Sequence, residues 1–309
     1  MKLLAIVLAL LIEQVRPLSV ERWIHAPLNR VADGCARRTF AGRAGSAVFF
    51  WCAFVGLATL AALLAHAVLG SVHPVLAVAF NLLVLYLTLG FRHESHYFTD
   101  IHLALGMGEL NRARHLLEQW RGESYPESSD SDVARLAVEE ALLAAHRNVF
   151  GVIFWFVVLP GPAGAVAYRL ADFLVRGWHR AGGAGEQVVL DRFSRRAFSV
   201  LDWVPARLTG ASFAIVGNFE DAILCWRTQA AQWPEPSSGI VLASGGGALG
   251  LRLGMPIQQS GALVERPELG AGEDVRVESM QGAIGLLWRA LLMCLLMLAL
   301  VSLVVWVAP

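Results

Sequence analysis

The sequence has 309 residues, of which 56% are hydrophobic and only 16% are charged. Soluble globular domains carry about a quarter charged residues, so this composition argues against an ordinary soluble protein. Acidic and basic residues balance at 25 each, so no net positive field indicates a nucleic-acid partner. The apolar residues are gathered into runs, which predicts a helical protein whose main partner is the lipid bilayer.

The first apolar run covers residues 3–12. No small-residue cleavage site precedes Glu13, so we expect a retained helix, either shortened or extended through Gln14 and Val15, rather than a cleaved signal peptide. Residues 13–45 are rich in arginine. Arginine-rich connections between apolar runs lie on the cytoplasmic side, so this loop is expected in the cytoplasm.

Three further apolar runs have the character of membrane helices. Residues 47–69 form the first unambiguous span, residues 75–91 return the chain, and residues 286–307 form the last span. The last run has a length of about 33 Å as a helix, enough to cross a hydrocarbon core of about 30 Å.

The longest polar segment, residues 92–148, is predicted to be a cytoplasmic helical segment. His93, His96 and Asp100 would share one helix face there, which makes them weak candidates for a metal site. No ligand motif accompanies them. Histidines beside a membrane helix explain the cluster equally simply, so no metal is assigned.

Residues 149–159 and 163–175 flank Pro160-Gly161-Pro162. They form either one long kinked span or a re-entrant hairpin, and arginines at both outer ends favour the hairpin. Arg169 and Asp172 are three residues apart and could pair on one helix face.

Residues 176–200 and 218–282 are predicted to be connections at the membrane periphery. Within the second, residues 240–254 contain three successive glycines, so they are expected to pack inside the bundle or at its surface rather than span the membrane. The fold predicted is all-α: one domain over residues 1–309, a polytopic integral membrane bundle with short or re-entrant helices and cytoplasmic helical connections.

The stretch from Ser199 to Gly217 contains Asp202, Trp203, Pro205 and Arg207 ahead of small and apolar residues. Proline suits the first turn of a helix, and an aspartate suits its amino end. An arginine within an apolar run needs a partner, a phosphate-like ligand or a route to the interface. The alternatives are therefore a plain helix cap with an interfacial arginine, or a polar site between membrane helices.

Five stretches, in order, resemble the CobD/CbiB family of cobalamin-biosynthesis membrane proteins and the related AmpE proteins. They are G-E-L-N-R-A-R-H-L-L at 108–117, I-F-W-F-V-V-L-P-G-P-A-G-A-V-A-Y-R at 153–169, L-D-W-V-P-A-R-L-T at 201–209, G-A-L-G-L-R-L-G at 247–254 and R-P-E-L-G at 266–270. The L-D-W-V-P form is similar to that of AmpE. The resemblance covers most of residues 92–309.

The resemblance implies an enzyme that joins cobyric acid to an aminopropanol unit in an ATP- and magnesium-dependent step, but acidic motifs of the family are not matched. The family's E-N-x-x-D-G corresponds to residues 143–148, its G-R-D-T is not evident between Arg121 and Asp132, and its N-T-L-D-S is replaced at 172–176. Magnesium prefers carboxylate oxygens. These departures favour a member without catalytic activity and without cofactors.

Two interpretations follow from the resemblance. In the first, an AmpE-like modulator of the bacterial inner membrane binds a small ligand or a protein partner through residues we list as candidates: Asp202, Trp203, Arg207, Arg169 and Asp172. In the second, the chain is an adenosylcobinamide-phosphate synthase-like enzyme using magnesium and ATP, with acids such as Glu139, Glu140 and Asp172. The sequence favours the first.

Overall fold

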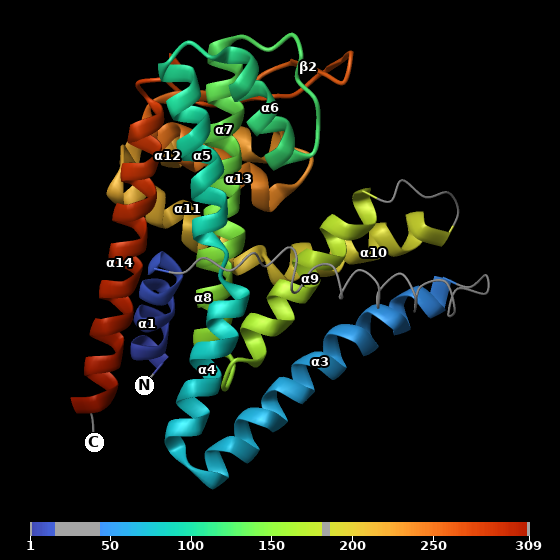
Figure 1. Ribbon diagram of the computed structural model, residues 1–309, viewed down its shortest axis with the longest axis vertical. Helices are drawn as coiled ribbons and strands as arrows, with labels where there is room; N and C mark the ends of the chain where they lie inside the picture. Colours follow the sequence, from blue (N-terminus) through green and yellow to red (C-terminus); the bar gives the residue numbers. More distant parts are fainter. Residues whose placement is uncertain (1, 16–43, 181–185, 308–309) are drawn as a thin grey trace. The chain divides into compact units, whose positions relative to one another are not determined.

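The computed structural model describes residues 2–15, 44–180 and 186–307 (Figure 1). The chain divides into two compact units. The first is Met1–Gly90 with Arg147–Asp202, and the second is Phe91–His146 with Trp203–Pro309. Most of the arginine-rich connection expected in the cytoplasm, residues 16–43, lies outside the described residues.

The first unit is helical throughout its described part. Its helices are α1 (Lys2–Val15), α3 (Ala44–Val72), α4 (Pro74–Thr88), α8 (Gly151–Val158), α9 (Ala163–Arg180) and α10 (Glu186–Leu201). The α3–α4 hairpin turns at His73, whose ring accepts the N–H of Val75 while Pro74 begins the next helix. Helix α9 packs against α3, α8 and α10. Phe50 and Leu174 are among the residues of the apolar core between α3 and α9.

The Pro160-Gly161-Pro162 segment forms a turn between α8 and α9, which pack against each other, so the alternative of one long kinked helix does not hold. That the two helices form a re-entrant hairpin in the membrane stays a prediction. Gly161 has a φ of 60°, which favours glycine. A Cβ on Gly164 would lie 2.0 Å from the carbonyl oxygen of Trp155. The two helices can therefore approach closely only because this position is glycine.

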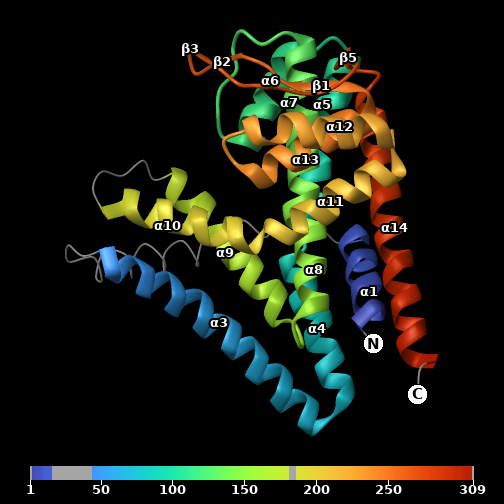
Figure 2. The same cartoon turned by 180° about the vertical axis from the view of Figure 1, so that it is seen from behind.

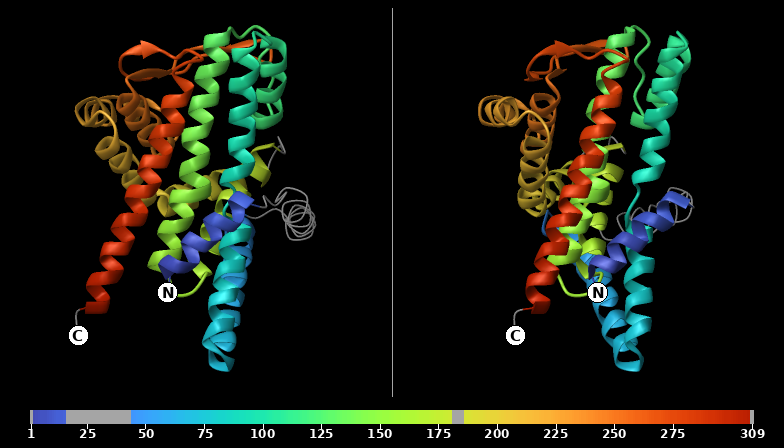
Figure 3. Two further views of the ribbon diagram at one scale, coloured as in Figure 1. Left: turned by 60° about the vertical axis from the view of Figure 1, so that its left-hand side comes forward. Right: turned by 90° about the vertical axis from the view of Figure 1, so that its left-hand side faces the viewer.

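The second unit contains both helices and short strands. Its helices are α5 (Phe91–Gly106), α6 (Leu110–Arg121), α7 (Asp130–Ala145), α11 (Trp203–Val216), α12 (Phe219–Gln229), α13 (Pro236–Leu249) and α14 (Met280–Val307), with a 3₁₀ turn η3 at Ala230–Gln232. Ser129 and Asp132 form a capping box that begins α7. Helix α14 packs against α7 and α11 (Figure 3).

Three helices of the described part are long and apolar enough to cross a membrane: Val48–Val72, Asp130–Val158 and Met280–Val305. The first and third confirm the spans predicted at 47–69 and 286–307. The run at 75–91 is a shorter apolar helix, Pro74–Thr88. A predominantly helical membrane fold is therefore confirmed, with a small strand content that the sequence did not indicate.

The second of these long helices differs from the sequence prediction. Helix α7, the π-helical segment η2 (His146–Phe150) and α8 form one helix, whereas the apolar run was expected to begin only at Val149. The charged residues Glu139 and Glu140 make the sequence of the first half of this helix resemble that of a solvent-exposed polar helix. The side chain of Glu139 is nevertheless buried within the second unit. The cytoplasmic location of residues 92–148 stays a prediction.

The glycine-rich helix α13 lies beside α12 and beneath the strands (Figure 2). Its residues from Ser238 to Ala248 are buried, which confirms that this run packs inside the bundle. The strands are β1 (Leu251–Gly254), β2 (Ile257–Gln259), β3 (Ala262–Val264), β4 (Glu268–Gly270) and β5 (Glu273–Asp274). Strand β1 lies between antiparallel β4 and parallel β5. A Cβ on Gly246 would lie 2.9 Å from the Cα of Gly270, so glycine admits this contact.

Candidate functional site

The five candidate ligand-binding residues fall in two different units. Asp202, Arg169 and Asp172 belong to the first unit, whereas Trp203 and Arg207 belong to the second. The first three lie in a buried cluster of charges, and the last two form a contact of their own. The five residues therefore belong to two separate groups, which are described in turn.

Asp172 joins two arginines of its own helix. Its Oδ2 lies 3.5 Å from Nη1 of Arg169, and its Oδ1 accepts Nε–H of Arg176 at 3.1 Å. The pairing of Arg169 with Asp172 that the spacing predicted is thus present. Burial raises the pKa of the Asp172 carboxyl, but the charges of Arg176, Arg169 and Arg147 outweigh burial and hold the pKa below its ordinary value. The carboxylate is therefore charged.

Asp202 lies at the junction of α10 and α11, where its carboxylate accepts the hydroxyl of Tyr168 at 2.7 Å. Both side chains are buried. A Cβ on Gly151 would lie 2.3 Å from the phenol oxygen, so glycine at the start of α8 makes room for the ring. Nearby, the indole of Trp155 donates to the carbonyl of Leu201 at 3.2 Å. The family-like stretches 153–169 and 201–209 thus meet in this unit.

Arg207 finds its partner within its own helix. Its guanidinium carbon lies 3.9 Å from the ring centroid of Trp203, and its Nη1 donates to the carbonyl oxygen of Trp203 at 2.8 Å. Trp203 is 55% exposed. A cation stacked on an exposed tryptophan is typical of a membrane interface, which agrees with the simpler of the two interpretations of this stretch. Pro205 lies in the first turn of α11, as predicted.

The weak metal candidates lie on α5. His96 receives a hydrogen bond from Nε of Arg92 at 3.4 Å, and Asp100 is exposed. The side chain of His93 lies outside the described residues. Among the side chains that are described, no three histidine, cysteine or acidic groups are placed to hold a metal ion.

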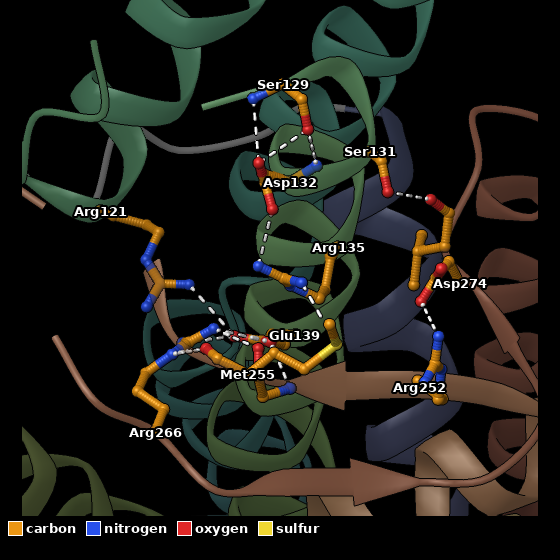
Figure 4. A network of polar contacts seen from close by, with 12 residues as sticks. Arg121, Ser129, Ser131, Asp132, Arg135, Glu139, Arg252, Met255, Arg266 and Asp274 are labelled. Atoms are coloured by element: carbon orange, nitrogen blue, oxygen red, sulfur yellow. Dashed lines mark hydrogen bonds and ion pairs between the residues drawn. The ribbon is translucent and has the colours of Figure 1, made fainter. Parts of the chain in front are cut away.

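A second buried cluster, which the sequence indicated only through the possible acids Glu139 and Glu140, lies in the second unit (Figure 4). Oε1 of Glu139 accepts the backbone N–H of Gly254 at 2.8 Å, and its two oxygens accept the guanidinium of Arg266 at 2.8 and 3.2 Å. Arg266 also donates to the carbonyl oxygens of Gly254 and Met255. Glu139 therefore fastens strand β1 and the loop before β4 to helix α7.

Arg121 completes this second cluster. Its Nη1 lies 3.8 Å from carboxylate oxygens of both Glu139 and Glu140, and its guanidinium carbon lies 5.8 Å from the ring centroid of Tyr125. Burial raises the pKa of the Tyr125 hydroxyl well above its ordinary value, although the charge of Arg121 opposes the shift. Glu139 and Glu140 thus lie beside two arginines, Arg121 and Arg266.

The sequence contains an indication of this cluster, but residue spacing alone does not show which residues pair. Glu139 interrupts the apolar pattern of α7, and Arg266 begins the R-P-E-L-G stretch. The structure pairs that stretch with 247–254, because β1 and β4 are antiparallel with Gly254 opposite Glu268. The family-like stretches 247–254 and 266–270 thus meet. Glu139 and Arg266, which pair beside them, are 127 residues apart in the sequence.

The magnesium ion implied by the resemblance does not fit these clusters as arranged. Magnesium requires several oxygen ligands, usually carboxylates. Asp172 and Glu139 direct their oxygens toward arginines, and Asp202 accepts from Tyr168. A guanidinium neutralises the carboxylate that it binds and occupies the same oxygens. These described carboxylates are therefore arranged as partners of arginine or tyrosine.

The fold and its buried ion clusters define a helical membrane protein. The family model described as CobD/Cbib protein matches residues 3–287. The chain is 33% identical over 275 residues to the cobalamin biosynthesis protein CobD of Stutzerimonas stutzeri, covering 87% of this chain and 88% of the relative. It is 35% identical over 225 residues to that of Chromobacterium violaceum, covering 71% of each.

The cobalamin biosynthesis protein CobD of Klebsiella pneumoniae is 29% identical over 283 residues, covering 87% of this chain and 86% of the relative. No solved structure matches. The chain belongs to the CobD/CbiB family, which confirms the resemblance drawn from its motifs.

Proposed function

We propose that the protein acts in cobalamin biosynthesis at the bacterial inner membrane, as a synthase-like protein that joins a corrinoid carboxyl group to an aminopropanol amine. The observation that supports this most is the similarity to proteins named cobalamin biosynthesis protein CobD over nearly nine-tenths of both chains. The family-like stretches that carry the resemblance also meet in pairs, at Tyr168–Asp202 and at Gly254–Glu268.

The residues of the first unit suit the handling of an acidic substrate. Arginines bind carboxylates and phosphates in a planar, bidentate manner. Arg169 and Arg176 can hold an anionic group in place, while Asp172 fixes the two guanidiniums relative to each other. In amide formation, such a group orients the substrate rather than making or breaking a bond.

A second candidate is the non-catalytic, AmpE-like modulator. One observation favours it: the buried carboxylates of both clusters are paired with arginines or with a tyrosine rather than gathered as oxygen ligands for magnesium. In this alternative the same arginines bind a ligand without converting it.

The test is a condensation assay on purified, detergent-solubilised protein with a corrinoid acid, aminopropanol or its phosphate ester, ATP and magnesium. Mass spectrometry detects the amide as the sum of the two substrates less one water. The relative from Stutzerimonas stutzeri, purified in the same way, serves as the control protein. Product from this chain supports the synthase; product from the relative and none from the folded chain contradicts it and leaves the modulator.

A further inference from the structure

Helix α11 of the second unit buries its hydroxyl groups. Oγ1 of Thr209 is hydrogen-bonded to Nδ1 of His146 at 2.9 Å, and both residues are buried. The hydroxyl of Ser212, also buried, donates to the carbonyl oxygen of Leu208 at 2.8 Å. On this inner side α11 packs against α12, α13 and α14 (Figure 2). The hydroxyl groups of the helix are thus satisfied within the unit rather than by water.

The opposite face of α11 is apolar and exposed. Val204, Leu208 and Ile215 are 38%, 51% and 59% exposed, and their spacing of four and seven residues places them on one side of the helix. Helix α6 of the same unit has the ordinary arrangement, because it exposes Gln119 and buries Leu117. The polarity of α6 is that of a helix in water, whereas the polarity of α11 is reversed.

Arg207 is the only charged residue of α11, and its charge stays beside its own helix. The guanidinium lies over the ring of Trp203 and donates to the carbonyl oxygen of that residue. Arginine and tryptophan side chains suit the membrane–water interface, where the apolar part of the side chain faces hydrocarbon and the polar part faces the headgroups. The pair therefore fits a helix at the edge of the hydrocarbon core.

Helix α14 provides a scale of membrane depth beside α11. Residues 290–307 contain no charge, and as a helix they extend about 27 Å, close to the thickness of a hydrocarbon core of about 30 Å. Arg289 precedes this stretch. Sγ of Cys294 lies 3.5 Å from Oγ of Ser212. The contact between α11 and α14 therefore lies inside the uncharged stretch, about 8 Å along α14 from Arg289.

The side chains of α14 around this contact are apolar and exposed. Leu292 is 61% and Leu296 is 59% exposed. In a helix that crosses a membrane, such side chains face lipid acyl chains. Helix α11 lies at the same level, so its outer face has the same surroundings. Its 14 residues extend only about 21 Å, too short to cross the core, so α11 fits within a single leaflet.

We propose that helix α11 lies within one leaflet of the bilayer, with Val204, Leu208 and Ile215 in contact with lipid acyl chains beside α14. The partner of this face is the hydrocarbon of the lipid, because the face adjoins the exposed apolar side of a membrane-spanning helix. The inference does not depend on the proposed condensation reaction. Its test needs no corrinoid, ATP or turnover, so the two proposals can fail separately.

The test places the photoreactive residue p-benzoylphenylalanine at Leu208 or at Ile215 of the full chain, reconstituted in phosphatidylcholine vesicles. After irradiation, mass spectrometry of the chain detects covalent lipid adducts. Leu296 of α14 is the positive reference, and Gln119 of α6 is the matched control, since both are exposed on helices of the same unit. The expected yield at each α11 position is within about threefold of that at Leu296 and at least about tenfold above that at Gln119.

Gel filtration in detergent selects folded protein before reconstitution, so every yield refers to a folded variant. Lipid adducts at both α11 positions support the proposal. A yield at the level of Gln119 at either position, or crosslinks to a second copy of the chain in place of lipid, would overturn it. Should one of the two α11 variants fail to fold, Val204 on the same face takes its place.

Discussion

The two units each bury a cluster of ionic side chains, but the clusters differ in balance and in access. In the second unit, Glu139 and Glu140 face Arg121 and Arg266, and Arg266 is bound on several sides by Glu139 and by backbone carbonyls. In the first unit, Asp172 pairs with Arg169 and Arg176 of its own helix, and exposure increases from Asp172 toward Arg176. We call the second cluster closed, because its side chains are bound within the fold, and the first open, because it reaches the more exposed Arg176.

This difference distinguishes a structural role from a ligand-binding role. The Glu139–Arg266 pair joins two segments far apart in the sequence, and its donors and acceptors are used within the fold. The Asp172 pairs lie within one helix and join nothing distant. We infer that the closed cluster holds the fold together and that the open one serves a ligand.

Glu139→Gln breaks the closed cluster and has the largest expected effect on stability. Removing one partner of a buried ion pair leaves Arg266 with an uncompensated charge, at a cost of about 3 to 5 kcal/mol. The change lowers the midpoint of thermal unfolding in detergent. Glu140→Gln is the control, because that side chain is 21% exposed and lies 3.8 Å from Arg121. Similar losses in the two variants would mean that Glu139 does not fasten β1 to α7.

Tyr168→Phe probes how the open cluster holds its second carboxylate. The change removes the hydroxyl that donates to Asp202 at 2.7 Å and keeps the ring, at a cost of about 1 to 3 kcal/mol. Thermal unfolding of the single variants and of Tyr168→Phe with Asp202→Asn forms a double-mutant cycle. A coupling energy near zero would show that the hydroxyl does not stabilise the carboxylate.

Tyr125→Phe changes a residue beside the closed cluster and has the smallest expected effect on stability. Because the pKa of Tyr125 is raised in the folded protein, its neutral form is favoured there, and the associated stability is complete below the ordinary value of 10.0 and is lost as pH rises above it. Unfolding midpoints measured from pH 9 to about 11.5 therefore fall more steeply in the wild type than in Tyr125→Phe. Parallel slopes would contradict the shift.

The sequence predicted the elements that depend on composition alone. The runs 47–69 and 286–307 are uninterrupted and apolar, and each became a long helix. Pro160-Gly161-Pro162 indicated a break, and the glycines of α13 indicated a buried helix in close contact with its neighbours. In these places the local chemistry and the fold agree.

The parts that were missed depend on contacts between distant segments. Nothing local shows that Glu139 binds Arg266, so the first half of the Asp130–Val158 helix resembled a polar segment. Gly246 and Gly270 admit the close contact between helix α13 and the short strands around Leu253. Of the candidate site, the Arg169–Asp172 pair followed from spacing, whereas the partners of Asp202 and of Arg207 required the structure.

The most direct test of the difference between the clusters is the shift in unfolding temperature that phosphate produces in Asp172→Asn and in Glu139→Gln, each relative to its phosphate-free sample. Asp172→Asn removes the carboxylate charge that pairs with Arg169 and Arg176, so phosphate should stabilise this variant more than the wild type. Glu139→Gln leaves the open cluster intact, so its phosphate shift should equal that of the wild type. Equal shifts in all three proteins, or a larger shift in Glu139→Gln than in Asp172→Asn, would contradict the assignment of ligand binding to the first unit.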